Sequence, residues 1–403
     1  MTGAILARSS SLNEIRVFRL LRFRVYTANI RLRTPILRRI RDIFSILHGI
    51  CVTFPHKSRE LCYSPNMNYS NENIGIILIN TGSPASPEPS DIRPYLIEFL
   101  SDKNIIRIPH AVWLPILHGI VARNRPKKTA PRYRQIWTPQ GAPLLVESLA
   151  QRDELNKRFA QEHLPLIAEI GMRYGSPSIK EALQSLKQQG CKRFIGFPLF
   201  PQTATCTTKT CKEKFLQSAS DAECAGFIEG YAHNPLYWKS LAQSITDHWI
   251  WQPGSKLLFS LHSIPLNDVK AGDTYLDEAQ QSLSETAKLL GLSSDDWAIA
   301  YHSRFEDSRA WAAPHPKTVL SSWADEGVQR VALVTPGFAA DCLESLYDIA
   351  FVAKEYFEQR CRAKGNTPEV SYIPALNHRS DHIDLLFDEV SKAVKSINNK
   401  ISF

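Results

Sequence analysis

Residues 256–265 read KLLFSLHSIP, and this stretch guides the interpretation of the whole chain. The apolar run that leads to His262 is typical of a buried parallel strand, so the histidine stands where a strand ends. Residues 330–344 (RVALVTPGFAADCLE) repeat the arrangement, with Glu344 shortly after the apolar run. In open α/β sheets, ligands bind beyond the carboxyl ends of the strands. The two stretches therefore predict that His262 and Glu344 face each other across one cleft.

Similar apolar runs alternate with helical stretches over most of the chain. The runs cover residues 74–79, 166–171, 194–199, 257–261, 297–301, 331–335 and 370–373. Residues 178–189 and 274–290 have apolar side chains at helical spacing, and residues 381–394 are amphipathic. This alternation predicts an α/β fold made of βαβ units. We expect two similar Rossmann-like halves joined near residues 225–235, each with a parallel sheet flanked by helices.

The domain boundaries follow from these runs and from composition. We expect a basic leader over residues 1–73, an N-terminal α/β domain over 74–228, a C-terminal α/β domain over 229–377 that carries His262 and Glu344, and a final helix over 378–403. The leader is either disordered or a gene-model extension whose true start is Met67. A mitochondrial transit peptide and a basic helix on a membrane surface are the alternatives, because the leader is rich in arginine and poor in acids.

The positive charge of the chain is concentrated in this leader. Residues 1–66 carry a net charge of +9, which leaves the other 337 residues at −1 although the whole chain is at +8. A nucleic-acid partner is therefore not expected. No uninterrupted apolar run reaches the roughly 18–20 residues of a membrane span. No glycine-rich nucleotide motif is present.

The eight cysteines are expected to be reduced thiols. Cys206, Cys211 and Cys224 have a spacing that matches no strong zinc pattern.

Histidine and glutamate at strand ends suit proton transfer at a metal. A neutral imidazole can accept a proton or bind a metal near neutral pH, and a carboxylate can hold the imidazolium or coordinate the metal. Asp348 lies four residues after Glu344, on the same face of a helix, and would extend an acidic path for metal or protons. The next position on that face is Val352, which carries no carboxylate. Both residues have structural alternatives. His262 could bond only to backbone, and Glu344 could form a capping box with Asp341 as N-cap.

Several motifs together resemble ferrochelatase over roughly residues 74–395. They are INTGSP (79–84), GMRYGSPSI (171–179), FPLFPQ (197–202), SRF (303–305) and YIPALN (372–377), in addition to the His262 and Glu344 stretches. The resemblance implies insertion of ferrous iron into protoporphyrin IX, the final step of haem biosynthesis. It also implies a porphyrin cleft between the two domains and a last helix that packs back on the first. Coproporphyrin III as substrate, or tetrapyrrole binding without catalysis, are the alternatives.

The resemblance assigns roles residue by residue. His262 and Glu344 would be catalytic and, with Asp348, would bind the metal. The porphyrin-site residues would be Asn80, Tyr133, Arg173, Tyr174 and Trp311. From the residues alone, Arg173 could instead form a salt bridge, and Tyr133 and Trp311 could pack in the core. Iron is a substrate, so no cofactor is expected. An iron–sulfur cluster is not expected either, because no cysteine follows Cys361.

Three positions depart from the family pattern. Ser263 replaces a glycine, His302 replaces a glutamine, and Ala142 replaces a serine. We expect a cytoplasmic protein, or a mitochondrial one if the leader is a transit peptide. The basic cluster Arg123, Arg125, Lys127 and Lys128 would either steer propionates or contact an anionic membrane surface, or it is a solvated loop.

A chain that starts at Met67 should fold and metallate porphyrin like the full chain, because residues 1–66 lie outside the family-like region. Circular dichroism and a porphyrin metallation assay on both forms check this. An insoluble or inactive shortened chain would contradict it.

Overall fold

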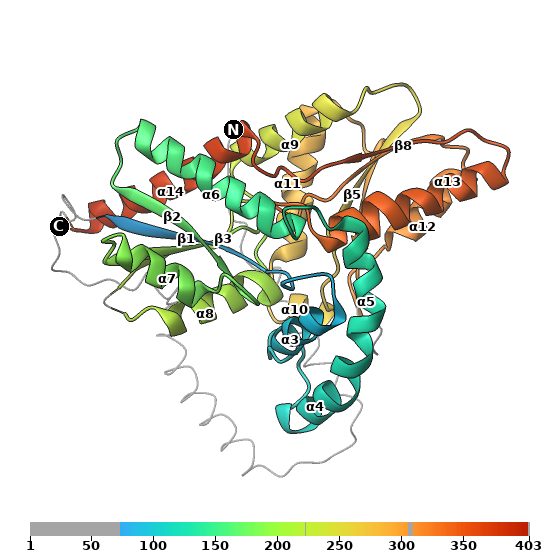
Figure 1. Cartoon of the computed structure of the whole chain (residues 1–403). Helices are drawn as coiled ribbons and strands as arrows, with labels where there is room; N and C mark the ends of the chain where they lie inside the picture. The colour runs from blue at the N-terminus through green and yellow to red at the C-terminus, as the bar shows by residue number, and fades with distance from the viewer. Residues whose placement is uncertain (1–72, 222, 305–308, 402–403) are drawn as a thin grey trace, which may run out of the picture. The chain divides into compact units, whose positions relative to one another are not determined.

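The computed structural model describes residues 73–221, 223–304 and 309–401, with side chains to residue 397 (Figure 1). The predicted leader, Cys51 and Cys62, and Phe305 of the SRF motif lie outside this range. Internal contacts divide the chain into Met1–Glu60 and Leu61–Phe403, and every described residue belongs to the second unit.

Two four-stranded parallel sheets form the framework. The first contains β1 (Ile74–Asn80), β2 (Leu166–Met172), β3 (Arg193–Pro198) and β4 (Cys224–Phe227) in the order β2-β1-β3-β4. The second contains β5 (Ser255–His262), β6 (Trp297–His302), β7 (Arg330–Val334) and β8 (Glu369–Ile373) in the order β6-β5-β7-β8. The predicted α/β fold is therefore confirmed, and the two sheets share one strand order.

This strand order places a topological switch point in each sheet. From β5 the chain passes to β6 on one side and then to β7 on the other, and β1, β2 and β3 follow the same course. The switch points lie between β1 and β3 and between β5 and β7, where open α/β sheets bind ligands.

Helices follow most of the strands. In the first half they are α3 (Pro89–Leu100), α4 (His110–Ile116), α5 (Ala122–Ile136), α6 (Pro143–Gln161), α7 (Ile179–Gln188) and α8 (Thr210–Ser218), with π-helical turns η2 (Leu117–Val121) and η3 (Thr205–Lys209). Further along are α9 (Pro235–His248), α10 (Leu266–Lys270), α11 (Tyr275–Leu289), α12 (Pro316–Asp325), the π-helix η4 (Glu344–Ala353), α13 (Lys354–Ala363) and α14 (Ser380–Ile401).

The expected helices at 178–189, 274–290 and 381–394 correspond to α7, α11 and α14. The short strand β4 was not predicted, and it lies where the sequence suggested the junction between the halves. Helix α14 packs against α6 and β4 and also against α9 (Figure 1). The domain boundaries proposed from the sequence stay predictions.

The turn that leaves β1 is locked against the loop that follows β2. The backbone N–H groups of Arg173 and Tyr174 donate to the carbonyl oxygens of Asn80 and Thr81 at 2.8 and 3.0 Å. Gly82 lies between these strands' ends with φ +104°, and a Cβ atom there would stand 1.9 Å from the Tyr174 carbonyl oxygen. Only glycine fits this position, because both the dihedral angle and the space exclude a side chain.

Gly82→Ala should therefore lower the free energy of unfolding by at least about 3 kcal/mol, since it adds a backbone clash to a strained dihedral angle. Gly190→Ala is the matched control: its φ is +84° but no atom lies within 4 Å of the added Cβ. The control should lose only about 1–2 kcal/mol. Urea denaturation compares them, and equal losses would show that the clash does not matter.

Candidate active site

His262 ends β5, beside the switch point of the second sheet. Its Nδ1 atom lies 2.8 Å from the carbonyl oxygen of Ser263. A carbonyl can only accept, so Nδ1 carries a proton, and in the neutral tautomer with that proton the lone pair lies at Nε2. The backbone bond that the sequence offered as an alternative to catalysis thus occupies one nitrogen and leaves the other for chemistry.

A second histidine lies beside His262 on the neighbouring strand. His302 pairs with His262 in the β5–β6 register, and the rings meet edge to face with centroids 5.9 Å apart. His302 is buried, its Nδ1 is 2.8 Å from Ser260 Oγ, and its Nε2 has no hydrogen-bond partner. Burial, and secondarily the neighbouring His262, lower the pKa of His302 well below its usual value, so this ring is neutral.

Glu344 is the first residue of η4, and the capping box that the sequence offered as an alternative role is not formed. The N-cap position is Leu343, and no side chain caps this end. Asp341 is buried two residues earlier, and its carboxylate accepts hydrogen bonds from Tyr372 (2.6 Å), Asn377 (2.9 Å) and Ser345 (2.8 Å). Tyr372 in β8 and Asn377 after it therefore bind the Asp341 carboxylate, which the local sequence pattern would place at the helix N-terminus.

The half-buried Glu344 carboxylate lies near buried polar groups of the first half. Burial raises the pKa values of the Tyr95 and Tyr133 phenols and the Cys342 thiol, and the charge of Glu344 raises each of them further. Cys342 precedes Glu344 by two residues and is buried. Glu344 therefore meets α3 and α5, which carry the two tyrosines.

The contacts connect His262 and Glu344 indirectly. His302 stacks on Phe338 with centroids 5.8 Å apart, and Phe338 packs on a cluster that includes Cys342, two residues before Glu344. Within the described ranges, no hydrogen bond or ion pair joins His262 to Glu344, and no group of three or more His, Cys, Asp or Glu side chains is arranged to hold a metal. Asp348 accepts a hydrogen bond from Ser303.

Arg173 and Tyr174 form a buried network around Asp102. Arg173 pairs with the Asp102 carboxylate and donates from Nε to Thr210 Oγ1 at 2.8 Å, and the Tyr174 hydroxyl donates to the same carboxylate at 2.9 Å. Burial opposes the charge of Asp102, but hydrogen bonds from Thr210 and Asn104 and the charge of Arg173 outweigh it and lower the pKa. The arrangement matches the salt-bridge alternative for Arg173. No sequence motif pointed to Asp102 or Thr210.

The other expected porphyrin-site residues differ in exposure. Asn80 is buried and donates from its amide to Ser148 Oγ at 3.2 Å. Tyr133 is buried and packs edge to face on Trp137. Trp311 is half-buried, and the guanidinium of Arg309 lies 4.6 Å from its ring centroid. Trp311 thus presents the most accessible ring of the set.

A cavity of about 800 Å³ lies beside the Lys103–His110 loop, and it includes Lys209, Asp268 and Asp273 in its wall. Neither His262 nor Glu344 lines it. We therefore place the candidate site by the chemistry of the strand ends and not by this cavity.

Comparisons of the sequence with known proteins identify the family. The sequence model of the family described as "Ferrochelatase" matches residues 73–394. A "Ferrochelatase" of Azoarcus sp. (strain BH72) is 37% identical over 328 residues, which cover 80% of this chain and 88% of the relative. One from Proteus mirabilis (strain HI4320) is 37% identical over 317 residues, covering 77% and 95%. Among solved structures, SirB from Bacillus subtilis with Fe3+ aligns over 82% of this chain and 98% of its own, at 12% identity and a TM-score of 0.48.

Asp341→Ala should lower the free energy of unfolding by about 2–4 kcal/mol, because it takes the acceptor from the buried Ser345 hydroxyl and from the half-buried Tyr372 and Asn377 donors. Asp325→Ala is the control: this exposed aspartate pairs with Arg360 and Lys364 on the surface, so its loss should matter far less. Urea denaturation of both variants checks the difference. Similar losses would show that the Asp341 network is energetically unimportant.

Proposed function

The chain belongs to the ferrochelatase family, and on that premise we propose that His262 and Glu344 carry out its reaction. The protein is a lyase-class metal chelatase that inserts iron into protoporphyrin for haem biosynthesis. Both iron and porphyrin are substrates. The observation that carries the residue assignment is the His262 imidazole, anchored at Nδ1 with its Nε2 lone pair left for a substrate.

His262 is the proton acceptor. Metallation must remove two protons from the pyrrole nitrogens before a divalent metal can lie in the plane of four nitrogens. A neutral imidazole at a strand end can take such a proton at Nε2, while the bond from Nδ1 to the Ser263 carbonyl keeps the ring in the required tautomer. The same lone pair can instead ligate the incoming iron.

Glu344 stabilises positive charge opposite His262. Its carboxylate can hold the imidazolium, relay the proton or coordinate ferrous iron. The buried Tyr95 and Tyr133 phenols and the Cys342 thiol feel the charge of this carboxylate, which raises their pKa values. Asp348, four residues further along η4, extends the acidic path for metal or protons.

We propose two kinds of porphyrin-site residue. Trp311 contacts the macrocycle directly, since it is half-buried where Tyr133 and Tyr174 are buried. Asn80, Tyr133, Arg173 and Tyr174 act mainly by shaping the wall, because their polar groups are committed to Ser148, Tyr95, Asp102 and Thr210.

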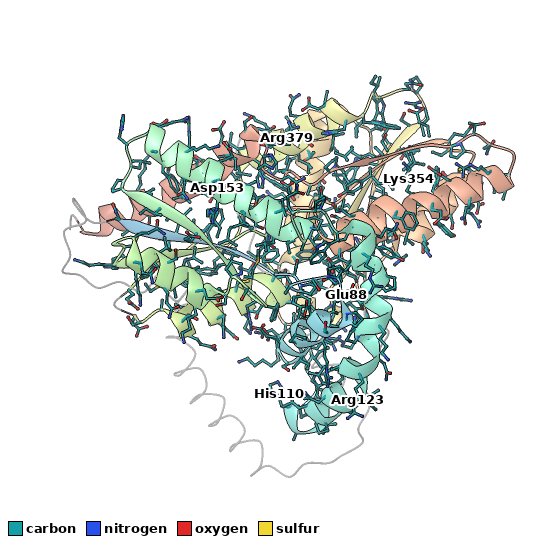
Figure 2. The ribbon with its side chains drawn as sticks, viewed as in Figure 1. Glu88, His110, Arg123, Asp153, Lys354 and Arg379 are labelled. Atoms are coloured by element: carbon teal, nitrogen blue, oxygen red, sulfur yellow. The ribbon has the colours of Figure 1, made fainter. Side chains whose placement is uncertain are left out.

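We further propose that the protein works in the cytoplasm and touches an anionic membrane through α4, η2 and α5. Ile108, Val112, Ile116 and Ile120 recur every four residues and are exposed. Arg123, Lys127 and Lys128 follow on α5 and are exposed as well. An apolar stripe beside basic residues suits the interfacial region of anionic lipid. Figure 2 shows His110 and Arg123 at the end of this helical group that lies away from the two sheets. No helix among the described residues is long and apolar enough to cross a membrane.

His262→Ala should abolish metallation while porphyrin still binds, because the proton acceptor is lost and the apolar walls remain. Glu344→Gln should cut turnover by roughly a hundredfold with little change in stability. Glu355→Gln, on the exposed face of α13, is the control and should change neither. Absorbance assays with ferrous iron, porphyrin fluorescence titrations and thermal melts decide the matter. Near-normal turnover of His262→Ala would make the histidine structural.

The membrane proposal is tested with vesicles of anionic and of zwitterionic phospholipid. Val112→Asp combined with Ile120→Asp should weaken binding to anionic vesicles by roughly tenfold or more, because two apolar side chains that would be buried in the membrane interface are lost. Ile250→Asp, another exposed isoleucine outside this stripe, should bind like the native chain. Equal effects of the two changes, or no vesicle binding by the native chain, would exclude this surface as the contact.

A further inference from the structure

Two of the three departures from the family pattern meet at His262. Ser263 follows it in the chain, and His302 lies beside it on β6. The Ser263 N–H donates to the His302 carbonyl oxygen at 2.8 Å, so the two positions are bonded to each other as well. Unusual residues at two contacting positions, both touching the same imidazole, call for a joint physical explanation.

Ser263 holds the acceptor that fixes one side of the His262 ring. Besides its N–H bond to His302, its hydroxyl donates to the Ala312 carbonyl oxygen at 3.0 Å, and the side chain is fully buried. The Ser263 carbonyl oxygen, which accepts from His262 Nδ1, is therefore part of a rigid segment. A glycine at this position would lack the hydroxyl bond.

His302 holds the other side of the ring. It lies between the edge of His262 and the face of Phe338. The hydrogen bond between His302 Nδ1 and Ser260 Oγ fixes the orientation of the His302 ring. Among the described residues, the Ser263 carbonyl and the His302 ring are the hydrogen-bond and ring contacts of His262.

We propose that His302, anchored by Ser260, is a positioning residue that holds the His262 imidazole for the metallation reaction. Packing alone does not explain a histidine there, because a buried ring nitrogen without a partner is costly and phenylalanine would avoid that cost. A polar side chain that bonds to Ser260 and still contacts His262 explains the choice. The inference rests on the proposed role of His262.

The test compares His302→Ala, His302→Gln and Ser260→Ala in the full chain. His302→Ala removes the support and should lower kcat by roughly tenfold to a hundredfold, the scale of a misplaced reacting group, with the porphyrin KM within about twofold. His302→Gln restores a group that can bond to Ser260 and should keep kcat within about threefold of the native value. Ser260→Ala removes only the anchor, so it should fall between these two and serves if His302→Ala does not fold.

A spectroscopic readout separates positioning from a merely structural role. Long-range ¹H–¹⁵N spectra of histidine-labelled protein report the tautomer of each ring, and His262→Ala identifies the His262 signal. The native chain should show His262 protonated at Nδ1, and His302→Ala should show a mixture of tautomers. Ser244→Ala removes another buried polar side chain, on α9, and should match the native chain in every measurement.

The proposal is overturned if His302→Ala keeps kcat within about threefold, if its effect falls on KM alone, or if the His262 tautomer is unchanged. The last measurement needs no turnover. If His262→Ala itself metallates porphyrin normally, the proposed function fails while the spectrum still decides whether His302 positions the ring.

Discussion

The candidate site depends on the reciprocal bond between Asn377 and Asp341. Asn377 accepts from the Asp341 N–H through Oδ1 at 2.8 Å and donates to its carboxylate through Nδ2 at 2.9 Å. Its carbonyl oxygen accepts from Gln151 on α6 at 2.9 Å and lies 2.7 Å from His382 Nδ1 on α14. One residue at the end of β8 thus joins the loop after β7 to helices of both halves. Because Asn377 holds Asp341 in place, the segment from Asp341 to Glu344 begins at a fixed position.

The division of labour between the two catalytic candidates follows from their surroundings. His262 is held by its own strand and by the neighbouring strand, so its geometry is a property of the second sheet. Glu344 instead has the Tyr95 and Tyr133 phenols of α3 and α5, from the first half, among its polar neighbours, together with Cys342. On the proposed roles, the positions of the two side chains depend on different parts of the fold, and Phe338 packs both on His302 and on the cluster that contains Cys342.

The positions of most strands could be predicted because strands buried in parallel sheets appear in the sequence as apolar runs. Seven of the eight strands were predicted from mostly apolar runs, although polar residues such as Glu169 in β2 and Ser371 in β8 interrupt some of them. The strand β4 (CAGF) has only four residues and overlaps the stretch that was expected to join the two halves. Local rules failed where distant partners compete. Asp341 has the spacing of a helix cap, yet Tyr372 and Asn377 take its carboxylate. Likewise, nothing near Arg173 in sequence indicates that Asp102 lies against it, and no pattern distinguishes the π-helix η4 from an α-helix.

Because His382 is buried, the stability of the junction at Asn377 depends on pH. Burial lowers the pKa of this histidine from 6.5 to about 4, and its Nε2 has no partner to share a second proton. A depressed pKa in the folded state means that the stabilising contribution is complete above pH 6.5 and is lost as the pH falls toward 4. Between these pH values His382 binds a proton when the chain unfolds, and calorimetry of unfolding would register this proton uptake. In this pH range, folding therefore releases a proton from His382, beside the Asn377 junction from which the Glu344 segment begins.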